Sequence, residues 1–258
     1  MSDLVAIVGK MESLLPPRTD EVQNALAPSG ILRAGINLSN FLLVTGKTPA
    51  GAPDGVSPGM AKALGRILNC DVEYVCFDSP GAVADAAAQE RWDIGNIGAD
   101  PARAEFITFT DAYCEIESTC LVPKGSPIKS FNDVDKPGIT IATKQRAAYT
   151  LWLERSIKHA ELKQFQSIDA SFDAFVEQKL DVLAGLKPRL LDDSARLQGS
   201  TIISGKFTSV QQAIGTLRKR DMTGAAFLQK FVKAAKIAGL VQCLIDTHGV
   251  TGKLSVAS

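Results

Sequence analysis

The 258-residue sequence lacks the features that mark several large classes of protein. No run approaches the roughly 18 apolar residues that a membrane-spanning helix needs, so we expect no membrane insertion. The 28 Lys and Arg residues are cancelled by 28 Asp and Glu residues, and a chain without excess positive charge is not expected to bind nucleic acid. Walker-type and G-x-G-x-x-G phosphate-binding motifs are also absent. The remaining composition, 45% apolar and 22% charged, is typical of a globular protein.

Cysteine is scarce, and its five positions fit neither disulfides nor a metal site. Cys114 and Cys120 are expected on one strand, where six residues span about 20 Å, whereas bridged Cα atoms lie within roughly 7 Å of each other. Cys70 and Cys76 flank another expected strand and fail for the same reason. No C-x-x-C pair suggests zinc. We therefore expect five reduced, buried thiols, no metal and no cofactor.

The N-terminal stretch does not have the pattern of an export signal. It lacks a basic start, an extended apolar core and a small-residue cleavage site, and reads MSDLVAIVGKMESLLPPRTDE. The odd number of cysteines is typical of a reducing compartment. We expect the chain as written to remain in the cytoplasm, unless its true start lies elsewhere.

Apolar periodicity predicts strands and helices in alternation. Residues 1–27 are expected to form an extension that contains a short helix beginning at Thr19 or Asp20. The segment Gly46–Pro58 is rich in Gly and Pro and is expected to be a loop. The expected strands include Ile31–Ile36, Val72–Phe77 and Ile94–Ile97, with helices around residues 60–68 and 81–91. This order predicts an α/β protein with open, mostly parallel sheets flanked by helices.

One segment carries more functional information than the rest. It runs from Asp93 to Tyr113 and reads DIGNIGADPARAEFITFTDAY, which places Arg103 six residues before Phe109. The pattern resembles type 3 solute-binding proteins, the amino-acid-type receptors of ABC importers, in which an Arg at this place binds a ligand carboxylate. A guanidinium on a short turn presents a planar pair of donors to such an anion. The resemblance implies this role for Arg103.

Further segments resemble the same family in the same order, from Ile31 to Gly252. They are GILRAGINLSN, SPGMAKALGRILN, LVPKGSPIKSFNDVDKPGITIATKQRAAY, and AIGTLRKRD with FLQKFVKAAKIAGLV. The resemblance implies a bilobed, periplasmic-binding-protein-like type II fold with a two-strand hinge. It implies an N-terminal extension (1–27), lobe 1 (28–114 and 208–258) and lobe 2 (115–207), with a small ligand bound in the cleft between the lobes. It also implies an ABC transporter permease as partner, and a periplasmic location if the true start differs.

Several ligand-contacting positions of the family have changed identity in this chain. Where the family carries an Asp and an aromatic residue after its first strand, this sequence has Asn37 and Asn40, next to Phe41. Where lobe 2 usually supplies an Asp for the ligand's ammonium group, it has Leu186 followed by Lys187. The ligand-binding residues that the resemblance implies are Arg103, Asn37, Asn40, Phe41, Asn96, Gly98, Asp100, Lys144, Gln145, Arg146 and Gln212.

These changes keep a cation for a carboxylate and remove the usual partner of an ammonium group. The helix N-terminus that binds the carboxylate in lobe 2 is expected at residues 143–146, with two added cations. Glu115 and Glu117, near the crossing between lobes, are the acids that could replace the missing Asp. Because an unpaired buried charge is costly, we expect the ligand to be a small organic acid or a polar amino acid held in another way.

Two other functions fit the same resemblance. Cyclohexadienyl dehydratases use this fold and an acid in the cleft to eliminate water and carbon dioxide from prephenate or arogenate. No matching general acid stands out in this sequence, so we expect no catalytic residues and no enzymatic activity. A cytoplasmic ligand sensor read by a partner protein is the other alternative, which the N-terminus favours.

Overall fold

The computed structural model describes the backbone of residues 2–258 and the side chains of residues 5–258, so Met1 of the predicted extension lies outside the described residues. The chain divides into two compact units. Unit 1 comprises Met1–Glu115 and Gln211–Ser258, and unit 2 comprises Ile116–Val210. Two long strands, β6 (Ile107–Val122) and β11 (Thr208–Leu217), carry the chain from one unit into the other.

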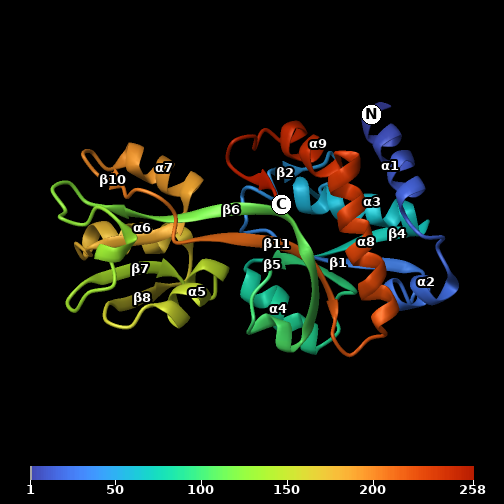
Figure 1. Cartoon of the computed structure of the whole chain (residues 1–258), viewed down its shortest axis with the longest axis horizontal. Helices are drawn as coiled ribbons and strands as arrows, with labels where there is room; N and C mark the ends of the chain where they lie inside the picture. The colour runs from blue at the N-terminus through green and yellow to red at the C-terminus, as the bar shows by residue number, and fades with distance from the viewer. Residues whose placement is uncertain (1) are drawn as a thin grey trace. The chain divides into compact units, whose positions relative to one another are not determined.

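Unit 1 is built on a sheet whose strands run in the order β4-β1-β5-β11-β6 (Figure 1). Strand β1 pairs in parallel with both β4 and β5, whereas β11 pairs antiparallel with β5. The other elements of unit 1 are α1 (Ser2–Leu14), α2 (Asp20–Leu26), β1 (Ile31–Asn37), β2 (Gly46–Lys47), β3 (Pro53–Asp54), α3 (Val56–Leu68), β4 (Asp71–Phe77), α4 (Pro80–Ala88), β5 (Ile94–Gly98), η1 (Arg103–Glu105), α8 (Met222–Ala238), α9 (Leu240–Thr247) and β12 (Ser255–Val256).

Helices cover both faces of the unit 1 sheet, as the alternating pattern predicts. Helix α4 packs on one face around the buried side chain of Trp92, whose indole N–H donates a 2.9 Å hydrogen bond to the carbonyl of Val83. Gly35 and Gly95 let this ring lie against the sheet, because a Cβ at either position would come within 3.0 Å of it. Helix α3 lies on the other face (Figure 1). Helices α1 and α2 pack against α8, so the N-terminal residues are part of unit 1.

Unit 2 is built on the strand order β6-β9-β7-β8, with β10 paired to the end of β6. Successive residues face opposite sides of its sheet, since Ile141 and Val182 pack with Leu153 of α5, whereas Ala142 and Leu183 pack with α6 and α7. This alternation explains why the strands are apolar throughout. The elements of unit 2 are η2 (Phe131–Asp133), β7 (Thr140–Lys144), α5 (Ala148–Ser156), β8 (Glu161–Phe165), α6 (Ile168–Glu177), β9 (Val182–Leu186), α7 (Lys187–Arg196) and β10 (Thr201–Ile202).

The expectation of a loop over Gly46–Pro58 is wrong. Strands β2 and β3 form a small hairpin there, closed by hydrogen bonds between Thr48 and Ala52 around Gly51, whose φ is +83°. Helix α3 then begins at Val56. Pro58 does not prevent this, because the first turn of a helix has no intrahelical partner for its N–H groups.

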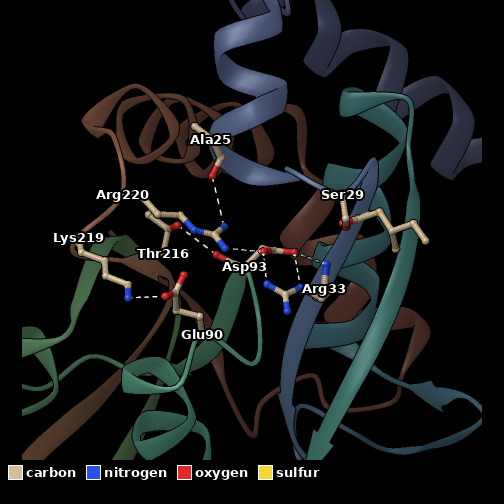
Figure 2. A network of polar contacts seen from close by, with 9 residues as sticks. Ala25, Ser29, Arg33, Glu90, Asp93, Thr216, Lys219 and Arg220 are labelled. Carbon is tan, nitrogen blue, oxygen red and sulfur yellow. Dashed lines mark hydrogen bonds and ion pairs between the residues drawn. The ribbon is translucent and has the colours of Figure 1, made fainter.

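A buried ion-pair network fixes the start of β5. The Asp93 side chain is fully buried and accepts hydrogen bonds of 2.8 to 3.1 Å from the backbone N, Nε and Nη2 of Arg33 and from Nη2 of Arg220. Figure 2 shows the carboxylate between the two guanidinium groups. Arg220 also donates to the carbonyl of Ala25 at 3.4 Å. One carboxylate therefore connects β5 to β1, to the end of α2 and to the segment before α8.

The five cysteines are free thiols, but they are not all buried as expected. Cys114 and Cys120 lie inside β6, and burial raises the pKa of both thiols well above the usual value. Cys70 and Cys243 are half-buried, and Cys76 is exposed. Cys76 lies on β4, the edge strand of the sheet.

Candidate ligand-binding site

The carboxyl ends of the parallel strands β1, β4 and β5 meet at one edge of the unit 1 sheet, which we call the unit 1 edge. Asn37 is the last residue of β1 and Gly98 the last residue of β5. Gln212 on β11 stands opposite Gly98 in the register of the two strands. The fold thus brings these three predicted residues together from distant parts of the sequence, at the side of an α/β sheet where small molecules generally bind.

Arg103 is held at this edge by the end of its own strand. After β5 the chain turns through Asp100, whose Oδ1 accepts a 2.9 Å hydrogen bond from the backbone N of Ala102. Arg103 begins η1 directly after this turn, and its Nη1 donates a 2.6 Å hydrogen bond to the carbonyl of Gly98. Only 6% of Arg103 is exposed. Arg is rarely so buried, and this burial excludes an ordinary surface ion pair.

Asn37 and Asn40 shape the segment that follows β1. The Oδ1 of Asn37 accepts hydrogen bonds from the backbone N of Ser39 at 3.1 Å and from its Oγ at 2.8 Å. The Oδ1 of Asn40 accepts from the backbone N of Leu42 at 3.2 Å. Such bonds stabilise tight turns. Because both oxygens accept hydrogen bonds within this turn, the groups that each side chain can offer a ligand are the N–H donors of its amide. Phe41 directly follows Asn40 and is half-buried.

Asn96 is the least satisfied of the predicted residues. It lies on β5, is 1% exposed, and neither its Oδ1 nor its Nδ2 has a hydrogen-bond partner among the described residues. Leaving a buried polar group without a partner costs about 1–3 kcal/mol. An amide at this position, at such a cost, indicates a role that an apolar residue could not fill.

The parallel strands β7, β8 and β9 end together at the corresponding edge of unit 2, which we call the unit 2 edge. Lys144 is the last residue of β7, and the backbone N of Gln145 donates to the carbonyl of Phe165, at the end of β8, at 2.8 Å. Arg146 follows in the left-handed backbone region, with φ of +57°. Helix α5 begins only at Ala148, so both cations precede the helix rather than occupying its first turn.

Lys144 is an unusual lysine because only 5% of it is exposed. Burial lowers the pKa of its ammonium group. The Oγ1 of Thr150, in α5, donates a 2.6 Å hydrogen bond to the Lys144 carbonyl, which fixes the end of the strand against the helix.

The two glutamates proposed as replacements for the missing Asp already have partners. The carboxylate of Glu117 lies 2.7 Å from Nζ of Lys187 and 3.6 Å from Nζ of Lys206. The hydrogen bond from Lys187 is the main reason that the pKa of Glu117 is lowered. Glu115 accepts a 2.9 Å hydrogen bond from Nε2 of Gln211. Sequence reasoning did not detect the pair between Glu117 and Lys187, which joins residues 70 positions apart.

The sequence also contains a G-x-S-x-G pattern, Gly55 to Gly59, of the kind that carries the nucleophile of many hydrolases. In such enzymes the serine oxygen is exposed on a sharp turn. Here Ser57 is 1% exposed in the first turn of α3, and its Oγ donates to the carbonyl of Leu43 at 3.4 Å. The pattern has a structural role at this place.

Other features do not compete with the two edges. A surface pocket of about 380 Å³ lies beside Phe106 and Arg218, near the amino end of β5, and none of its lining residues is a predicted ligand-binding residue. Within the described side chains, no group of three or more His, Cys, Asp and Glu residues is placed to hold a metal ion. Among residues 2–258, no helix combines the length and the apolar composition needed to cross a membrane.

Comparison with known proteins agrees with this architecture. Solved structures similar to the chain include a mutant of ArgBP from T. maritima, with a TM-score of 0.70, 17% identity, and coverage of 88% of this chain and 99% of that one. A putative binding component of an ABC transporter from Wolinella succinogenes, complexed with lysine, has a TM-score of 0.69 at 20% identity, covering 84% and 95%. An ancestral amino acid-binding protein, described as a precursor of cyclohexadienyl dehydratase, has a TM-score of 0.68 at 22% identity, covering 87% and 97%.

These likenesses establish the periplasmic-binding-protein-like fold that the sequence predicted. A search of curated proteins finds no match. The family model of bacterial extracellular solute-binding proteins, family 3, matches residues 38–249, which is most of the chain. The chain therefore belongs to the bacterial extracellular solute-binding proteins of family 3.

Proposed function

We propose that this protein captures a small ligand through a carboxylate group that binds Arg103, as the receptor component of an ABC importer. Membership of a solute-binding family supports the general role. Proteins of the same fold include an ancestral arginine-binding protein bound to glutamine and a putative transporter binding component complexed with lysine. We identify unit 1 with the predicted lobe 1 and unit 2 with the predicted lobe 2. We expect the ligand to be an organic acid or a polar amino acid.

The observation that carries the proposal is the hydrogen bond from Arg103 to the carbonyl of Gly98. It holds Nη1 of a guanidinium whose N–H donors form a planar fork. The bond fixes the direction of that fork at the unit 1 edge, and a fixed fork matches the two oxygens of a carboxylate. Amide donors from Asn37 and Gln212 at the same edge, and the buried amide of Asn96, support a polar ligand rather than an apolar one.

A thermal-shift screen with isothermal calorimetry tests the proposal. Arg103→Ala should lose about 2–5 kcal/mol of binding free energy, or roughly 30- to 5000-fold in affinity, because the bound anion loses its main partner. Arg103→Lys should also bind weakly, since an ammonium group cannot reproduce the planar fork. Arg66→Ala, which removes an exposed Arg of α3 in the same unit, is the matched control. Equal affinity in Arg103→Ala and Arg66→Ala would show that the ligand lies elsewhere.

The second candidate function is a dehydratase, which is favoured by the ancestral relative described as a precursor of cyclohexadienyl dehydratase. Such an enzyme needs an acid at the site, and the two glutamates that could replace the missing Asp, Glu117 and Glu115, are engaged by Lys187, Lys206 and Gln211. These pairings support binding without turnover. Incubation with prephenate and arogenate decides between the functions, because a dehydratase would release carbon dioxide and an aromatic product.

A further inference from the structure

The segment that carries Arg103 is too short to hold its own position. Helix η1 has three residues and is closed by a 3.2 Å hydrogen bond from the backbone N of Phe106 to the carbonyl of Arg103. Hydrogen bonds in such short turns have poor geometry, and the last carbonyls of a helix have no partner within it. The position of Arg103 therefore depends on groups that bind η1 from outside.

Arg218 binds the end of this segment twice. It directly follows β11, and its backbone N donates a 2.9 Å hydrogen bond to the carbonyl of Phe106. Its Nη1 donates a 2.6 Å hydrogen bond to the carbonyl of Ala104, inside η1. Arginine side chains near the end of a helix can bind its last carbonyls in this way. Because hydrogen bonds from a charged donor are stronger than neutral ones, we expect the side-chain contact to contribute more than the backbone contact.

Strand β11 fixes both ends of the segment that follows β5. Gln212 stands opposite Gly98 in the register of β11 with β5, and Arg218, just beyond the end of β11, binds the end of η1. The carbonyl of Gly98 in turn accepts the hydrogen bond from Nη1 of Arg103. An extended strand keeps its two ends at a nearly constant distance from each other. The guanidinium of Arg103 is thus held on a segment that one strand supports at both ends.

Apolar packing contributes little where Arg218 meets η1. A pocket of about 380 Å³ lies there, lined by Glu105, Phe106 and Arg218 together with the ends of α4 and β11. Phe106 is 49% exposed, although large apolar side chains are usually buried. A segment that borders an open pocket has few neighbouring atoms to keep it in place. The two hydrogen bonds from Arg218 therefore restrain η1 more than they would in a packed core.

We propose that Arg218 is a positioning residue for ligand binding, which holds the end of η1 and so fixes the direction of the Arg103 guanidinium. In the proposed function, on which this inference rests, Arg103 binds a ligand carboxylate. A guanidinium that is already held in place loses less conformational entropy when the ligand binds. Without the Arg218 side chain, the ligand has to order η1 as it binds, and its affinity falls.

Hydrogen exchange of the ligand-free protein tests the positioning itself. The backbone N–H groups of Ala104 and Phe106 both donate to carbonyls within the same segment, so their exchange rates report how often this segment opens. Arg218→Ala should raise both rates by about 10-fold, as expected for the loss of one charge-assisted hydrogen bond. The amides of β5 should keep their exchange rates.

Lys219→Ala is the matched control. Lys219 is exposed and lines the same pocket, but it pairs with Glu90 rather than with η1 (Figure 2), so its removal should change neither rate. Arg218→Lys should restore slow exchange, because an ammonium group can also donate to a single carbonyl. Circular dichroism checks that each variant is folded. If Arg218→Ala does not fold, Arg218→Met takes its place, because it keeps an apolar stem and removes every donor of the side chain.

Calorimetry then tests whether this positioning serves binding. The probes are glutamine, lysine, arginine and succinate, since the proposed ligand is a polar amino acid or an organic acid. Arg218→Ala should weaken binding of the best probe by about 5- to 30-fold, and Arg218→Lys should recover most of this loss. The double variant with Arg103→Ala should bind within about twofold of Arg103→Ala alone, because a residue that acts through Arg103 adds nothing once that guanidinium is removed.

The outcomes separate this inference from the proposed function. If Arg218→Ala leaves either the exchange of η1 or the affinity unchanged, while Arg103→Ala abolishes binding, the positioning role is wrong and the proposed function stands. If the losses of the two single variants add in the double variant, Arg218 acts independently of Arg103 and the positioning role is again wrong. If no probe binds, or if Arg103→Ala binds the best probe as tightly as the unchanged protein, both the proposed function and the positioning role are overturned.

Discussion

The Asp93 network allows a quantitative prediction about stability. Replacing Asp93 by Ala leaves two guanidinium groups around an empty buried position, with Arg33 and Arg220 retaining side-chain exposures of 30% and 15%. Removing one partner of a buried ion pair costs about 3–5 kcal/mol. Because Arg33 can regain water through its exposed part, we expect a loss of about 3 kcal/mol in the free energy of unfolding. Asp93→Asn keeps the volume and one acceptor oxygen and should cost about 2 kcal/mol.

Tryptophan fluorescence measures this loss in the correct unit. The chain has two tryptophans, and Trp92 is buried directly beside Asp93 in unit 1, whereas Trp152 is in unit 2. In a Trp152→Phe background, urea unfolding followed at Trp92 reports unit 1 alone. This avoids the assumption that both units unfold in one transition. Asp71→Asn, an exposed carboxylate at the start of β4, is the matched control.

One result would contradict this prediction. If the free energy of unfolding of Asp93→Ala lies within about 1 kcal/mol of that of the background protein, the carboxylate stabilises unit 1 by no more than an exposed ion pair would. Stability above that of the background would mean that the cost of burying the three charges exceeds their attraction. That is a known outcome for buried ion pairs replaced by apolar groups.

Three further predictions concern other parts of the chain. Gly55→Ala should destabilise unit 1 by about 1–3 kcal/mol or more, because φ is +150° there and a Cβ would lie 2.3 Å from the carbonyl oxygen of Leu43. Thermal unfolding measures this loss, and an unchanged Tm would contradict the prediction. If Lys144 binds a ligand carboxylate, as the family resemblance implies, affinity should fall as pH rises through its lowered pKa, because the ammonium group loses its charge, and Lys144→Arg should remove this dependence in calorimetry. In the native protein, Cys76 should react with a thiol reagent before Cys114 and Cys120, because burial in β6 raises the pKa of those two thiols. Mass spectrometry of the labelled protein identifies the order of reaction, and early labelling of a cysteine in β6 would be the contrary result.

The sequence by itself determined much of the fold, because the relevant signals are local. Apolar runs separated by helical periodicity identify β1, β4 and β5, and Thr19 caps the helix that begins at Asp20 as predicted. The Gly46–Pro58 hairpin was missed because two-residue strands are held by pairing across a turn rather than by any apolar pattern. The place of Arg103 after β5 could likewise be found by counting from a strand, since a strand and the turn that follows it are adjacent in the chain.

The tertiary structure alone decided which charges meet and which are buried. Glu117 could have been a ligand for an ammonium group until the pairing of β6 with β9 put Lys187 beside it. Lys144 was expected at the N-terminus of a helix, yet it ends a central strand and is 5% exposed. Asp93 joins two arginines from strands and segments more than 100 residues apart. Pairing between distant residues depends on the order of strands in the sheet, and the local periodicity of the sequence carries no information about that order.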